Sequence, residues 1–312
     1  MYLLTILGRR ALQIISTVLV VAVLMFTLMH LLPGDPAQVM LGDRGSAAAI
    51  AQLHHDLGLD RSIPVQFWDF VKRIAILNLG DSVTMQIPVT DLIIERLPIT
   101  LLLTAMAACL AVLIAVPLAL VAALRQGSWA DAVVRGYSQV SLSMPVFYIG
   151  LVLLIILAAG LRWFPVGGIG SGFFQDLYYL FLPALTLALS LSAILLRNLR
   201  SSLIEVLHAE FVGFAIAKGL PRRIVLGRHV LRNASISMVT LLGLNIGSLI
   251  GGAVITETVF GIPGVGRLMV DSIFSRDYAV VQGLTMALCV LVSTVFLAVD
   301  ALHTLLDPRI SS

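Results

Sequence analysis

The residues of this chain that could bind or react are concentrated in one segment, residues 205–233, which lies between two long apolar runs. Seven of the chain's 20 lysine and arginine residues fall between Arg197 and Arg232. A basic, helix-forming segment between membrane spans is typical of a cytoplasmic loop. We therefore expect the chemistry of this segment to be recognition of something on the cytoplasmic side.

The order of residues in this segment predicts a helix, a sharp turn and a second helix. Apolar residues recur at helical spacing through 203–218, where Lys218 occupies the last turn. Gly219 follows at a position that favours left-handed backbone, and Pro221 can start a short helix over 222–232. Such a knob fits a groove on a soluble partner. The alternative is an amphipathic hairpin that lies on anionic lipid headgroups.

The composition places these elements in a membrane. Hydrophobic residues make up 59% of the chain, charged residues 12%, and the mean hydropathy is +1.02. A helix needs about 20 apolar residues to cross a bilayer, and single strands cannot satisfy their backbone in lipid. We therefore predict an all-α integral membrane protein with six transmembrane helices, at residues 11–32, 99–124, 136–161, 177–196, 234–256 and 279–299.

The distribution of charge predicts that both termini are cytoplasmic. In that orientation the cytoplasmic segments 1–10, 125–135, 197–233 and 300–312 hold twelve basic and five acidic residues. The outer segments 33–98, 162–176 and 257–278 hold eight basic and twelve acidic residues. Basic residues concentrate in cytoplasmic loops. The net charge of +3 is thus a topological asymmetry, and we expect no nucleic-acid partner.

The first apolar run is too long for a cleavable signal peptide. It spans about 22 residues, against the usual 7–15, and no small-residue cleavage motif follows it. We interpret it as an uncleaved first span. Cys109 and Cys289 both fall inside predicted spans, and no metal-binding spacing is present. We therefore predict no catalytic residue, bound metal or cofactor in this chain.

Two outer segments have recognisable features. Residues 33–98 open with two prolines and a glycine that stop the first span, and continue with predicted short helices at 47–57 and 63–77. A simple spacer is the alternative reading of this insertion. In the last outer loop a carboxylate that could neutralise Arg267 stands beside glycines and a proline. We interpret five residues there as a candidate outer gate or binding-protein contact: Glu257, Phe260, Pro263, Gly264 and Gly266.

Several short motifs occur in one order along the whole chain. They are Arg9-Arg10, Pro33-Gly34-Asp35-Pro36, Leu57-Gly58-Leu59-Asp60, Gly80 with Ser82, Glu95-Arg96-Leu97-Pro98, Glu205-Val206-Leu207, Ala217-Lys218-Gly219-Leu220, Leu231-Arg232-Asn233-Ala234, the 257–266 stretch, Arg276-Asp277-Tyr278 and Asp307-Pro308-Arg309. In this combination the chain resembles the permeases of ATP-binding-cassette (ABC) importers, above all the dipeptide/oligopeptide/nickel branch. Residues 205–234 resemble their "EAA" loop. Three residues depart from that pattern: Phe211 replaces a tyrosine, Gly213 a glutamate and Ser237 a proline.

The resemblance implies a type I importer permease in the bacterial cytoplasmic (inner) membrane. Its implied partners are a second permease, two cytosolic ATPase subunits that bind ATP and magnesium, an extracytoplasmic substrate-binding protein and membrane lipid. The implied domains are 1–32, the outer insertion 33–98, and a core permease domain 99–312 that includes the cytoplasmic coupling loop 197–233. The residues implied in ATPase coupling are Glu205, Leu207, Phe211, Phe214, Ala215, Ala217, Lys218, Gly219 and Leu220.

Other functions fit the residues less well. No phosphate-binding loop occurs, so the chain is not itself the ATPase. A secondary transporter usually places ionisable groups within its spans, but here only His30 lies near the end of one. Motifs of intramembrane enzymes do not occur. For the substrate we expect a dipeptide or oligopeptide, with nickel or a metal chelate and glutathione as the alternatives.

Overall fold

The computed structural model describes residues 2–31, 60–76 and 78–306, together with Ser46, Ala48, residues 51–52 and His55. Within these residues the regular structure is helical, apart from an isolated bridge between Asp81 and Pro88. The all-α prediction is confirmed. Most of the helix predicted at 47–57 lies outside the described residues, as do Gly34 and Asp307 of the sequence motifs.

Five helical segments in the described part of the chain are long and apolar enough to cross a membrane. They correspond to the predicted spans one, two, four, five and six: Leu12–Leu31 within α1 (Tyr2–Leu31), α5 (Val89–Leu124), α8 (Phe173–Leu207), Arg222–Val259, and Tyr278–Val299 within α13 (Tyr278–Leu306). The second span begins ten residues earlier than the predicted 99, because α5 continues through Pro98.

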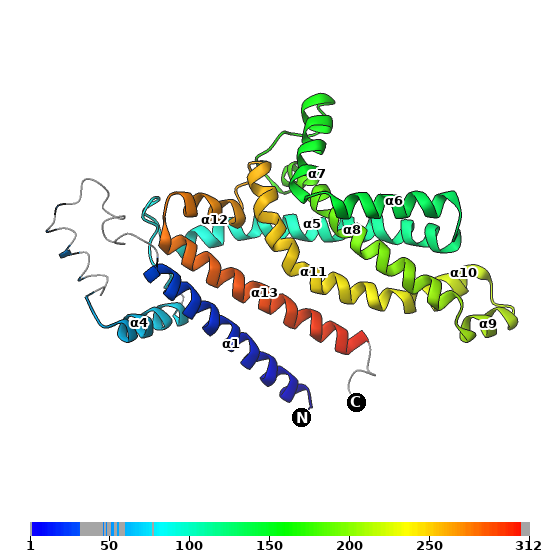
Figure 1. The fold of residues 1–312 in the computed structure, drawn as a ribbon, viewed down its shortest axis with the longest axis horizontal. Coiled ribbons are helices and arrows are strands. Elements are labelled where there is room, and N and C mark those ends of the chain that lie inside the picture. Colours follow the sequence, from blue (N-terminus) through cyan, green and yellow to red (C-terminus); the bar gives the residue numbers. More distant parts are fainter. Residues whose placement is uncertain are drawn as a thin grey trace. The chain divides into compact units, whose positions relative to one another are not determined.

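The third predicted span, 136–161, is wrong as a single helix. The segment consists of α6 (Trp129–Ser143), α7 (Val146–Leu153) and the π-helix η2 (Leu154–Gly160), with a bend of 108° between α6 and α7. Met144 at the bend is extended (φ −93°, ψ 132°) because the ring of Pro145 disfavours helical backbone in the residue before it. The bend is visible where α7 turns away from α6 (Figure 1). The pair forms a broken span or a re-entrant loop.

The chain divides into two compact units, of which the first comprises residues 1–97 and 268–294. In this unit α1 packs against α4 (Ile63–Ala75), and Ala22, Phe70 and Met286 form a small core. The helix predicted at 63–77 is thus confirmed. Residues 268–294 join this unit although the sequence assigned them to the core permease domain. Ser82 Oγ donates a 2.6 Å hydrogen bond to Asp277 Oδ2, which holds the 78–88 loop at the start of α13.

The second unit comprises residues 98–267 and 295–312, and α8 is its centre. This helix packs against α6, α7 and α11 (Arg232–Val259), so its leucines and alanines are buried over most of its length. Alanines at every fourth position of α5, from Ala107 to Ala119, are fully buried in the same apolar core. The α5–α6 turn and the short helices α9 (Glu210–Ala217) and α10 (Arg222–Ile224) lie at the same end of this unit (Figure 1).

Candidate functional site

The predicted helix 203–218 is interrupted, which corrects the description of the coupling loop. Helix α8 ends at Leu207, and α9 begins only at Glu210. At the break the Nδ1 atom of His208 lies 2.8 Å from the carbonyl oxygen of Ile204, and Ala209 is extended (φ −71°, ψ 142°). Glu205 and Leu207 therefore belong to the end of a membrane-spanning helix and not to the loop helix. Glu210, in contrast, places a negative charge in the first turn of α9, where the helix dipole favours it.

The end of α9 has the geometry that the sequence predicted. Gly219 has φ +78°, its N–H donates to the carbonyl of Ile216 at 2.9 Å, and the N–H of Leu220 donates to the carbonyl of Ala215 at 3.3 Å. These two bonds form a Schellman motif, which satisfies the last carbonyls of the helix. The prediction of a left-handed glycine is confirmed. The chain consequently reverses within a few residues after α9.

The exposed side chains of α9 are largely apolar. Phe214 is 68% exposed, Ile216 is 62% exposed and Phe211 is 44% exposed, whereas Val212 and Ala215 are buried in the core of the unit. Ala217, Lys218 and Leu220 are also exposed. Ala215, one of the residues implied in ATPase coupling, therefore does not belong to the exposed surface of α9, because its side chain packs inward. Phe211 and Phe214, three residues apart, lie on one side of the helix and form the surface that we call the α9 face, whereas Ile216 lies on another side.

The return to the membrane is continuous. Pro221 caps α10, which leads into the π-helix η3 (Val225–Leu231) and then into α11, so that residues 222–259 form one helical segment. The predicted helix start after Pro221 is confirmed, but the helix does not end at 232 and continues into α11. Ser237, which replaces an expected proline, lies inside α11 and keeps its N–H available, so α-helix continues through this position.

The candidate outer gate is built around the buried carboxylate of Glu257. Its Oε1 accepts a 2.5 Å hydrogen bond from Thr100 Oγ1 in α5, and its Oε2 accepts a 3.0 Å bond from the backbone N–H of Arg267. Thr100 Oγ1 also accepts a 3.0 Å bond from the N–H of Val265. The two side chains thus satisfy N–H groups in the first turn of α12 (Val265–Phe274) that have no partner within that helix.

The glycines and Phe260 of this loop have packing roles. A Cβ on Gly264 would collide with the Glu257 carboxylate, and one on Gly266 would lie 2.5 Å from Val254 Cα. The ring of Phe260 is 2% exposed and lies against Gly150 of α7. Since Glu257, Phe260, Gly264 and Gly266 are all buried, direct contact of these residues with a binding protein does not fit the structure. Their role in a gate remains a prediction.

The expected pairing of Glu257 with Arg267 takes a different form. The carboxylate bonds the backbone of Arg267, while the guanidinium donates from Nη1 to the carbonyl oxygen of Gly261 at 2.8 Å. Sequence reasoning missed Thr100, which lies 157 residues away from its partner. It also missed the ion pair between the buried Asp131 and the half-buried Arg200. The signal that could have drawn attention to Asp131 is that it is the only acidic residue in the segment 125–135, which also contains Arg125 and Arg135.

The long apolar helices, joined by the reversing segment between α8 and α11, define an integral membrane protein. Residues 115–312 match the family described as binding-protein-dependent transport system inner membrane component, and residues 3–104 match its N-terminal domain. The chain belongs to this family of ABC importer permeases.

Individual relatives agree with this assignment. The chain is 36% identical over 305 residues to a probable peptide ABC transporter permease of Sinorhizobium fredii and 38% identical over 302 residues to a glutathione transport system permease of Pectobacterium atrosepticum, with 97% of both chains covered in each case. Among solved structures, the inward-facing MetNI methionine ABC transporter gives a TM-score of 0.59 at 15% identity, over 70% of this chain and 97% of that one. This last likeness shows the fold.

Family membership fixes the general role of the chain. It is a non-enzymatic, multi-pass inner-membrane subunit, and ATP is handled by partner ATPases. Dependence on a binding protein belongs to the same description.

Proposed function

We propose that this chain forms, with a second homologous permease, a pathway for the import of peptides, and that two cytosolic ATPase subunits drive it through α9. The observation that carries the coupling role is the α9 face. Phe211 and Phe214 are exposed on one side of a helix that is fixed at both ends, by the extended Ala209 and by the Gly219 turn. Exposed aromatic residues on a rigid, projecting helix are typical of the centre of a protein–protein contact.

The buried residues of α9 support transmission of movement. Val212 and Ala215 hold the helix against the core of the second unit, which also includes the buried residues of α8. Because packed cores resist compression, a displacement of α9 is passed to the helices that it contacts. An exposed apolar helix could also lie on lipid, as the alternative interpretation has it. The α9 face must therefore be tested for its partner.

The first experiment replaces Phe214, which is 68% exposed and whose loss leaves the core unchanged. The variant Phe214→Asp should still insert in the membrane but lose most of the co-purifying ATPase subunits and the ATP-driven uptake. Phe214→Leu is the matched control and should keep both, because it preserves an apolar side chain. Full ATPase recovery and uptake with Phe214→Asp would overturn the coupling role.

The substrate is tested separately, in vesicles that contain the complete transporter and its binding protein. Relatives named for peptide and for glutathione transport are both about equally similar to this chain, and these names support a peptide-like substrate. We expect uptake of a labelled dipeptide or oligopeptide that excess unlabelled peptide suppresses. Stronger uptake of glutathione would favour the second candidate, and uptake confined to a nickel chelate would contradict both.

A further inference from the structure

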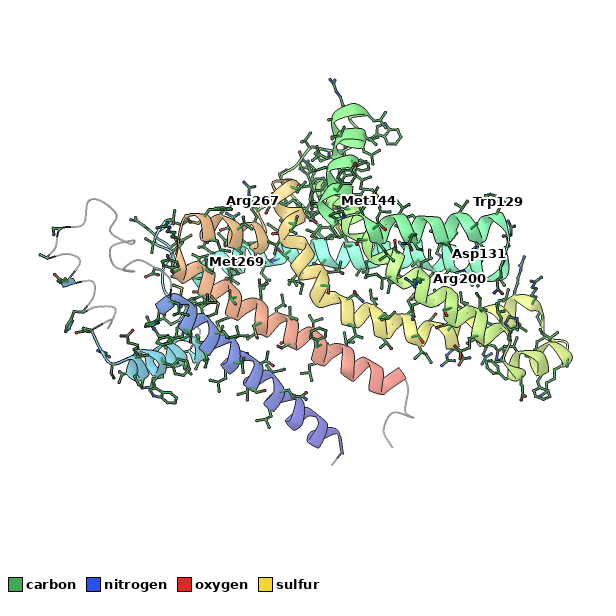
Figure 2. The ribbon with its side chains drawn as sticks, in the orientation of Figure 1. Trp129, Asp131, Met144, Arg200, Arg267 and Met269 are labelled. Carbon is green, nitrogen blue, oxygen red and sulfur yellow. The ribbon has the colours of Figure 1, made fainter. Side chains whose placement is uncertain are left out.

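An ion pair between the buried Asp131 and the half-buried Arg200 joins α6 to α8 near the end of the unit that carries α9. Arg200 donates from Nε to Asp131 Oδ1 at 2.7 Å and from Nη2 to Asp131 Oδ2 at 2.8 Å. Figure 2 shows both residues beside the α5–α6 turn, where Trp129 begins α6. Paired, charge-assisted hydrogen bonds of this kind fix the relative orientation of the two groups as well as their distance. The contact is therefore a rigid one.

The surroundings of Asp131 complete the attachment. Asp131 is 1% exposed, and its Oδ2 also accepts a hydrogen bond from the N–H of Gly127 at 3.1 Å. Ser128 Oγ caps α6 by accepting a hydrogen bond from the N–H of Asp131. Arg135, one turn further along α6, lies 3.6 Å from the same carboxylate, with its side chain 60% exposed. The carboxylate thus ties the α5–α6 turn, the start of α6 and α8 together at one point.

Further polar contacts between α6 and α8 continue along the pair. Tyr137 Oη lies 2.6 Å from Ser192 Oγ and donates to the carbonyl oxygen of Leu189 at 3.2 Å, and Ser141 Oγ donates to the same carbonyl at 2.9 Å. In an apolar surrounding each of these groups would be costly to leave unpaired. Helix α6 is therefore bonded to α8 near both of its ends.

We propose that the Asp131–Arg200 pair is a positioning device that makes the α5–α6 turn, α6 and α8 move as one body when the ATPases displace α9. This inference rests on the proposed coupling role of α9. Arg200 precedes Leu207, the last residue of α8, by about two turns, or roughly 10 Å along the helix axis. Helix α9 packs against η3, and η3 packs against α8. A displacement of α9 therefore reaches α8 through η3, and the ion pair then passes it to α6.

The functional test compares uptake per ATP hydrolysed in reconstituted transporter with Asp131→Asn, Arg200→Lys and the control Arg135→Gln. Both changes to the pair should lower uptake per ATP roughly tenfold, the scale of a coupling residue, while the ATPase subunits stay attached. Arg135→Gln should behave as wild type, because that side chain is largely exposed. If Asp131→Asn does not accumulate in the membrane, Arg200→Lys, which retains the charge, is compared with Arg135→Gln instead. Wild-type uptake per ATP in both pair variants would overturn the proposal.

A distance measurement tests the rigid body directly. Spin labels on Trp129→Cys and Ser201→Cys, both exposed positions, report the separation of the α5–α6 turn from α8 in the assembled transporter. We expect the same narrow distance distribution without nucleotide and with ATP, and a broad one in the Asp131→Asn background. A shift of the wild-type distance on ATP binding would contradict the proposal. Such a shift would not affect the proposed coupling role of α9, because that role is tested separately, by whether the ATPase subunits still co-purify with Phe214→Asp.

Discussion

Thr100 and Glu257 lie 157 residues apart in sequence, yet the Oγ1 and Oε1 atoms of their side chains are 2.5 Å apart in a buried hydrogen bond. Through this bond α5, the end of α11 and the first turn of α12 share one polar centre. The carboxylate acts as a helix cap supplied from a different helix. This arrangement explains how a polar side chain is accommodated within the core of the second unit, since both of its oxygens accept hydrogen bonds.

Replacement of Glu257 should destabilise the outer turn. Glu257→Leu leaves the buried N–H of Arg267 and the hydroxyl of Thr100 without their acceptor, at a cost of about 3 kcal/mol for the unpaired groups. Glu257→Gln keeps one acceptor oxygen and should cost less. The measurement is the apparent melting temperature of the purified transporter in detergent. Equal melting temperatures for wild type, Leu and Gln variants would refute the capping role.

The close approach of Gly264 to this carboxylate gives a second prediction. Gly264→Ala places a methyl group against Glu257 and should lower the melting temperature and uptake together. The control is Gly136→Ala in α6, because a Cβ there meets no atom within 4 Å. That variant should be neutral or slightly stabilising, by up to about 1 kcal/mol from helix propensity. Similar behaviour of the two variants would show that the outer turn is not tightly packed.

Two glycines of the coupling segment form a matched pair for the next test. A Cβ on Gly213 or Gly219 would meet no atom within 4 Å, but only Gly219 has a left-handed backbone, with φ +78°. Gly219→Ala should therefore be strained by about 1–2 kcal/mol and should weaken ATPase attachment, whereas Gly213→Ala should not. Quantitative co-purification of the ATPase subunits measures both. Unchanged attachment in Gly219→Ala would show that the turn does not set the position of α9.

The predicted orientation can be tested with single cysteines in a background without Cys109 and Cys289. Gly172 is exposed, and a Cβ there meets no atom within 4 Å, so Gly172→Cys should be tolerated. It should react with an impermeant thiol reagent in intact spheroplasts. Arg222→Cys, on the predicted cytoplasmic side, should react only after lysis. The reverse labelling pattern would overturn the assignment of cytoplasmic termini.

Local chemistry allowed much of the fold to be predicted. The lengths of the apolar runs located five spans. The residues Lys218-Gly219-Leu220-Pro221 were enough to predict how α9 ends, because a Schellman turn depends only on neighbouring residues. Proline was less informative. Pro145 ends a helix, whereas Pro117 and Pro183 lie inside α5 and α8. A proline is tolerated inside a span when neighbouring helices satisfy the backbone groups that it leaves unbonded. The sequence does not show which helices are neighbours.

The candidate site was harder to predict where it depends on distant contacts. The bonds from Glu257 to Thr100 and from Asp131 to Arg200 join different helices, so spacing along the chain carries no signal for them. The inward direction of the Ala215 side chain could not be predicted, for a related reason. Helical periodicity placed it among apolar neighbours, but α9 is short and apolar on several sides, and tertiary packing alone determines which side is buried.

Contact between the α9 face and an ATPase subunit can be detected by site-specific photo-crosslinking in living cells. A photoreactive benzoylphenylalanine replaces Phe214, or Phe174 as a control that is 84% exposed and lies on the predicted outer side. We predict a covalent adduct with the ATPase subunit from position 214 and none from position 174. Adducts only with lipid at position 214 would rule out this contact and show that the segment lies on the membrane surface.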